Sequence, residues 1–127
     1  METAMDRPVD GALTAALASA VVQITRDYTG RGPTKARASI HSDVLVVAMQ
    51  DTLTKGERSL RDNGKSEMVL EVRRCFQATM KDELVDRVQQ LSGRKVVAFM
   101  SDNHIEPDMA VEIFVLEPLP VNGATAV

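Results

Sequence analysis

The spacing of apolar residues changes twice along this chain, each time at a glycine. Before Gly30 and before Gly93, apolar residues recur at intervals of three and four, as they do on one face of a helix. After each glycine the spacing becomes that of strands, either alternating or continuously apolar. Glycine ends helices readily because it adopts left-handed backbone angles at little cost. We therefore expect a helix followed by a pair of strands in each half of the chain.

Two hairpins account for most of the expected strands. Residues 35–40 alternate polar and apolar, residues 41–43 supply a turn, and residues 44–49 form a continuous run typical of a central strand. A second hairpin is expected from residues 95–100 and 111–116 around a loop at residues 101–108. Within it Glu112 is a lone acid in an apolar strand, and alternation predicts that it points outward to solvent.

Two helices are expected between the hairpins. Thr54 and Glu57 have capping-box spacing at the start of the first, a short helix that ends at residues 63–64. The second spans residues 66–91 and carries Val72 and Phe76 on its apolar stripe. Its interspersed charged residues, Arg73 among them, predict a solvated face that could also serve for docking.

The fold class predicted is α+β, with the order α-β-β-α-α-β-β and helices on one face of an antiparallel sheet of two hairpins. The chain has 127 residues, the size of one domain. We expect a single domain over residues 11–118, a flexible arm over residues 1–10 and a disordered tail over residues 119–127. Hairpins with few helices leave a sheet face or edge poorly covered, which favours a homodimer or larger assembly.

Composition excludes several classes of protein. The net charge of −3 argues against a nucleic-acid-binding protein. Cys75 is the single cysteine, so no internal disulfide can form. No apolar run approaches the roughly 20 residues of a membrane-spanning helix, and no secretory signal stands at the N-terminus. We expect a soluble, cytoplasmic protein.

The segment between the first helix and the first strand, residues 29–37, is rich in glycine and positive charge. It could bind an anion or an acidic partner, because glycines let the backbone approach a ligand and the cations supply charge. The alternative is a helix cap and a rigid turn, with the strand cations facing solvent. The segment follows a helix and precedes a strand, so it is not a nucleotide-binding P-loop. The candidate binding residues are Gly30, Arg31, Gly32, Thr34, Lys35 and Arg37.

A second set of candidates lies in the two hairpin loops. His41, His104 and Asp108 have side chains that bind ligands, and the histidines would meet if the two hairpin tips lay together. Turn formation is the simpler interpretation of the acidic residues there, so no metal site is assigned. Cys75 is interpreted as a structural cysteine, buried or at the boundary of the core. No catalytic residue and no cofactor is assigned.

Several segments resemble the MpsC-type domain family. The most specific are Gly-Arg-Gly-Pro-Thr-Lys at residues 30–35 and Gly-Arg-Lys-Val-Val-Ala-Phe-Met at residues 93–100, supported by residues 53–58, 72–77 and 111–116. The resemblance implies a soluble accessory to a sodium-translocating, membrane-potential-generating system, reached through protein contacts and peripheral to the inner face of the membrane. The family offers no catalytic residues to carry over. The leading hypothesis is a non-enzymatic binding module. The alternative is a free-standing regulator that binds a phosphorylated metabolite or nucleotide at residues 30–37.

Overall fold

The computed structural model describes residues 11–119. The expected order of elements is confirmed, and the predicted arm over residues 1–10 and all but Leu119 of the predicted tail lie outside the described residues. In sequence order the elements are α1 (Gly11–Thr29), β1 (Lys35–His41), β2 (Val44–Gln50), α2 (Lys55–Asp62), α3 (Ser66–Ser92), β3 (Val96–His104) and β4 (Met109–Leu116).

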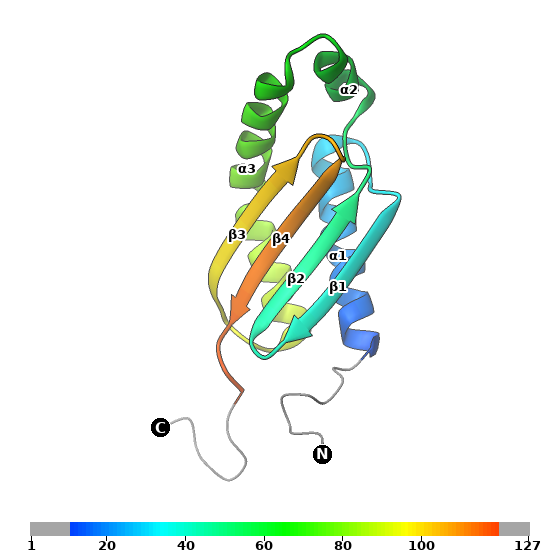
Figure 1. The fold of residues 1–127 in the computed structure, drawn as a ribbon. Coiled ribbons are helices and arrows are strands. Elements are labelled where there is room, and N and C mark those ends of the chain that lie inside the picture. Colours follow the sequence, from blue (N-terminus) through cyan, green and yellow to red (C-terminus); the bar gives the residue numbers. More distant parts are fainter. Residues whose placement is uncertain (1–10, 120–127) are drawn as a thin grey trace.

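The four strands form one antiparallel sheet in the order β1-β2-β4-β3. The two apolar strands β2 and β4 therefore lie at its centre, as continuous apolar runs predict. Figure 1 shows α1 and α3 together behind the sheet, with the opposite face of the sheet toward the viewer. The α+β architecture predicted from the sequence, two antiparallel hairpins with helices on one face, is confirmed.

The helix boundaries follow the local chemistry of the sequence. Gly30 and Gly93 have φ angles of 82° and 69°, and their N–H groups donate to carbonyls in the last turns of α1 and α3. Both glycines thus end their helices in the left-handed conformation, as expected. At the start of α2, the side chains of Thr54 and Glu57 each bond the other residue's backbone N–H, which confirms the capping box.

The second hairpin is longer than its sequence suggests. β3 continues to His104, four residues past the predicted end, and β4 begins at Met109. Polar residues 101–103 pair in register with β4, where Ser101 lies opposite Glu112 and Asp102 opposite Val111. Pairing with a central strand therefore outweighs the weak strand propensity of Ser, Asp and Asn.

The core lies between the sheet and α1 and α3. Its fully buried side chains come from these two helices and the two central strands, with Phe114 the largest. Phe76 packs against this core from a partly buried position, as its place in the stripe predicts. Val72, expected in the same stripe, is 39% exposed, whereas Arg73 is 4% exposed. The prediction that Arg73 lies on a solvated face is therefore wrong.

Candidate functional site

The face of the sheet opposite the helices has an apolar centre. Along β2 and β4, alternate residues point into the core, and the residues between them point away from α1 and α3. These outward residues are only partly buried, and on the neighbouring strand β3 Met100 is 50% exposed. We call this surface the open face. Its apolar members on the two central strands are Val44, Val46, Ala48, Met109, Val111, Ile113 and Val115.

Charged residues lie on the two margins of the open face. Lys35 and Arg37 are exposed on β1, one edge strand, and Asp102 is exposed on β3, the other. An open depression of about 530 Å³ lies beside the two cations. It is lined by Thr34, Lys35, Ala36, Arg37, Ala48, Gln50 and Met109.

The first part of the candidate loop is occupied by structural contacts. The guanidinium of Arg31 forms an ion pair of 2.8 Å with the carboxylate of Asp51 and also donates to the Asp51 carbonyl. A Cβ atom on Gly32 would come within 2.8 Å of the Arg26 guanidinium, so this glycine allows close packing. Arg31 thus fastens the end of α1 to the segment after β2, while Gly30 and Gly32 contact Arg26 within α1.

The second part of the loop faces the open side. Thr34, Lys35 and Arg37 line the depression, although the Thr34 N–H already donates to the Gln50 carbonyl at 3.2 Å. The structure therefore divides the predicted six-residue site into a structural brace and an exposed basic margin. Binding of a phosphorylated metabolite or nucleotide at residues 30–37 stays a prediction. Arg31, one of the three cations expected to bind it, already forms an ion pair with Asp51.

The secondary candidates do not come together. The β1–β2 turn and the β3–β4 turn lie at opposite ends of the sheet, so His41 and His104 are far apart (Figure 1). His104 Nδ1 lies 2.8 Å from the Pro107 carbonyl, within its own turn. The Asp108 carboxylate accepts from the N–H groups of Thr52 and Leu53 at 3.0 and 2.9 Å, which ties the segment after β2 to the β3–β4 turn.

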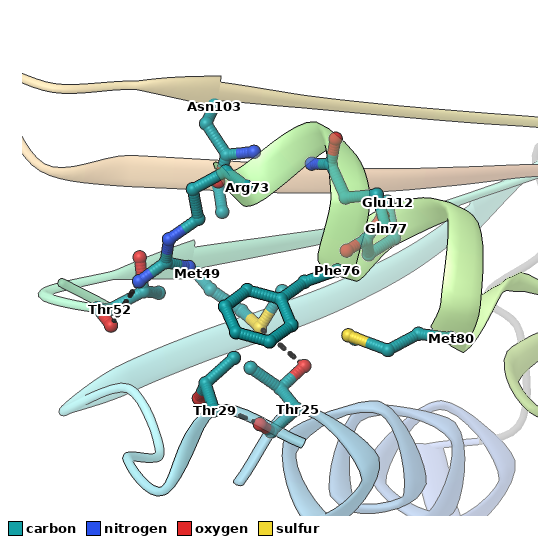
Figure 2. A pocket seen from close by; sticks show the side chains of 11 residues that line it. Thr25, Thr29, Met49, Thr52, Arg73, Phe76, Gln77, Met80, Asn103 and Glu112 are labelled. Atoms are coloured by element: carbon teal, nitrogen blue, oxygen red, sulfur yellow. Dashed lines mark hydrogen bonds between the residues drawn. The ribbon is translucent and has the colours of Figure 1, made fainter. Parts of the chain in front are cut away.

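A buried ion pair lies at the end of the sheet near α2. Arg73 Nε donates to Glu57 Oε2 at 2.8 Å. The same guanidinium donates to the Thr52 carbonyl at 2.7 Å, and this second bond is drawn in Figure 2. Burial raises the pKa of the Glu57 carboxyl, but hydrogen bonds from Arg73 and from Thr54 outweigh it and hold that pKa below its usual value. This ion pair joins α3 to α2, and the bond to Thr52 joins α3 to the segment between β2 and α2.

A second carboxyl, Glu112, faces a small cavity beside this pair. Its side chain is 3% exposed, and neither its Oε1 nor the Oγ of Ser101 opposite makes a hydrogen bond within the described residues. Burial raises the pKa of Glu112 to about 7, and the positive charge of Arg73, which favours the ionised carboxylate, only partly offsets this effect. The cavity, of about 10 Å³, has room for about one water molecule and includes Asn103 and Gln77 among its polar lining residues (Figure 2). The prediction that Glu112 points to solvent is wrong.

A protein-family model shows which family the chain belongs to. The model described as "Na+-translocating membrane potential-generating system (MpsC)" matches residues 10–118. The chain belongs to the MpsC family. Comparison with curated proteins and with solved structures gives no match.

This MpsC domain shows no membrane-crossing segment in the part described, since no helix within residues 11–119 has the length and apolar character required. Within the same residues, no group of three or more His, Cys, Asp or Glu side chains is placed to hold a metal ion. Cys75 is exposed, contrary to the expectation of a buried or boundary position.

Sequence reasoning missed the cluster of Glu57, Arg73 and Glu112 in the MpsC domain. Glu57 was recognised only through its capping role. The available signal was Glu112, an acid within an otherwise apolar strand. Such a residue lies either on a solvated face or against a polar interior, and only the pairing of β4 with its neighbours decides between them.

Proposed function

We propose that this protein is a non-enzymatic accessory module of a Na+-translocating, membrane-potential-generating system and that it binds protein partners through the open face of its sheet. The observation that carries the proposal is the open face itself, where two central strands present apolar side chains away from the helices. Membership of the MpsC family supports the link to the ion-translocating system.

The chemistry of the open face suits a protein partner. An apolar centre with a polar margin is the arrangement found in protein interfaces. The depression beside Lys35 and Arg37 is large enough for a small molecule but is open to solvent, whereas small-molecule sites typically bury most of their ligand. We place the module in the cytoplasm, at the inner face of the membrane, where it is held by contacts with the other components of the system.

Two methionines allow a matched test of this function. Met100 lies on the open face and is 50% exposed, and Met68 lies on α3 and is 49% exposed. Since both side chains are about half exposed, we expect folding to tolerate a charge at either position, but only a charge at Met100 would interrupt the open face. The full chain, tagged in its own cells, is purified in mild detergent as wild type, Met100→Glu and Met68→Glu.

We expect the membrane components of the ion-translocating system to co-purify with the wild type and with Met68→Glu, and to fall at least tenfold with Met100→Glu. Absence of those components from the wild-type sample would contradict the link to the system. Equal recovery with both variants would show that the open face is not the contact surface.

A further inference from the structure

We infer that the open face binds a second copy of this chain, with a two-fold axis that runs parallel to the strands between β2 and β4. The inference takes from the proposed function only that the open face binds protein. Since one face cannot hold both at once, a second copy and a component of the ion-translocating system would replace one another on it, as a weak dimer allows. It rests on the register of the sheet, which places opposite charges at the two ends of one row of residues.

The decisive row crosses all four strands. Arg37 on β1 lies opposite Ala48, Ala48 opposite Val111, and Val111 opposite Asp102 on β3. The row therefore begins with an exposed cation, crosses two small or branched apolar residues, and ends with an exposed carboxylate.

A two-fold rotation about an axis along the strands exchanges the positions of β1 and β3. Because Arg37 and Asp102 lie on the same row, this rotation brings Arg37 of each copy over Asp102 of the other, and two ion pairs form at once. Such an interface is self-complementary, as a two-fold interface must be. Lys35, one row further, adds positive charge at the same margin.

The other simple arrangements are disfavoured by charge. An axis perpendicular to the strands would place β1 over β1 and β3 over β3, so that neither Lys35 nor Arg37 would face the carboxylate of Asp102. Pairing of two β1 edges would bring the cations of the two copies together, and charged residues on an edge strand oppose such pairing.

The centre of the open face fits sheet-on-sheet packing. Apolar faces of two sheets pack about 10 Å apart with strands nearly aligned, and β2 of one copy would lie over β4 of the other. Four strands about 4.8 Å apart and about 3.3 Å per residue in rise give a flat area of roughly 450 Å² per copy. This size is at the low end for a specific interface, so we expect a dimer that dissociates in the micromolar range.

Charge exchange tests the arrangement in the full chain by sedimentation equilibrium over micromolar to millimolar concentrations. We expect the wild type to change from a mass near 13.9 kDa to twice that mass as concentration rises. Arg37→Glu alone and Asp102→Arg alone each place like charges at both contacts, and each should raise the dissociation constant at least tenfold. Arg87→Glu makes the same charge change on the exposed surface of α3 and should leave the constant unchanged.

The equimolar mixture of Arg37→Glu and Asp102→Arg gives the sharpest result. In the heterodimer one contact pairs Glu at position 37 with Arg at position 102, and the other keeps the wild-type pair. The dissociation constant measured for the mixture should therefore return to within about threefold of the wild-type dissociation constant. Persistent monomer in the wild type, or a mixture as weak as its components, would overturn the inference.

The two proposals fail in different ways. A monomeric wild type that still loses system components with Met100→Glu would overturn the dimer and leave the proposed function standing. A dimer that obeys charge exchange but recovers no component of the ion-translocating system would overturn the proposed function alone.

Discussion

Arg73 and Arg74 are adjacent on α3, but the first is buried and the second is exposed. We predict that Arg73→Ala lowers the free energy of unfolding by about 3–5 kcal/mol, because it leaves the Glu57 carboxylate buried without its partner. Arg74→Ala should change it by less than about 0.5 kcal/mol, as expected for an exposed side chain. Urea denaturation of the two variants measures the difference, and equal losses would show that the buried pair is not stabilising α3 against α2.

The burial of Arg73 could not be read from helical spacing alone. Positions 69, 73, 80 and 84 are separated by four, seven and four residues, so they share a helix face as readily as the predicted stripe through Val72 and Phe76 does. Because Val72 is apolar and Arg73 is charged, composition favoured Val72 as the residue that faces the core. A buried arginine needs a partner, and Glu57 lies 16 residues earlier, on another helix whose packing against α3 the sequence does not specify.

At the scale of elements, the segment between α1 and β1 allows two effects on stability to be tested separately: that of backbone conformation and that of charge. We predict that Gly30→Val lowers the free energy of unfolding by about 1–2 kcal/mol, because the glycine has a φ of 82° and a β-branched residue is strained there. A Cβ atom at this position meets no other atom within 4 Å, so the loss would come from conformation and not from a clash. Thermal melting of the variant against the wild type measures it.

The charge reversal Lys35→Glu with Arg37→Glu is the matched change in the same segment. Both side chains are exposed, so the melting temperature should stay close to the wild-type value. Dimerisation and recovery of protein partners should fall together, since both cations lie on the margin of the open face. A reversal that melts far below the wild type, beside a Gly30→Val variant that melts normally, would contradict this division of roles.

Element boundaries were predictable where one residue determines the backbone, and the outward face of β1 was predictable from its cations, but the inward face of β4 was not. Gly30, Gly93 and the Thr54–Glu57 capping box gave helix ends that the structure confirms. In β4, however, residues of both alternating sets are apolar, so either set could face the helices. Polarity favoured an outward Glu112, whereas the burial of Phe114 in the core places Glu112, two residues away, inward.

At the scale of the whole molecule, the two interior carboxyls oppose each other in their response to pH. The pKa of Glu57 is lowered on folding, so the stability it contributes is present above the unfolded pKa of about 4.3 and is lost as the pH falls through the folded value. The pKa of Glu112 is raised to about 7, so the folded protein holds this proton more tightly than the unfolded chain does. The stability linked to that proton is complete below the unfolded pKa and is lost as the pH rises through about 7.

We therefore predict that the free energy of unfolding of the wild type falls between about pH 5 and pH 8, by at most about 3 kcal/mol for the shift at Glu112. Glu112→Gln keeps the size of the side chain and cannot ionise, so its stability should vary much less over the same range and exceed that of the wild type most clearly at pH 8. Urea denaturation at unit steps of pH gives both curves. Every other ionisable side chain is common to the two proteins, so the difference between the curves isolates Glu112. A wild-type curve parallel to that of Glu112→Gln would mean that Glu112 stays ionised in the folded interior, with the Arg73 charge and the cavity supplying enough stabilisation to offset its burial.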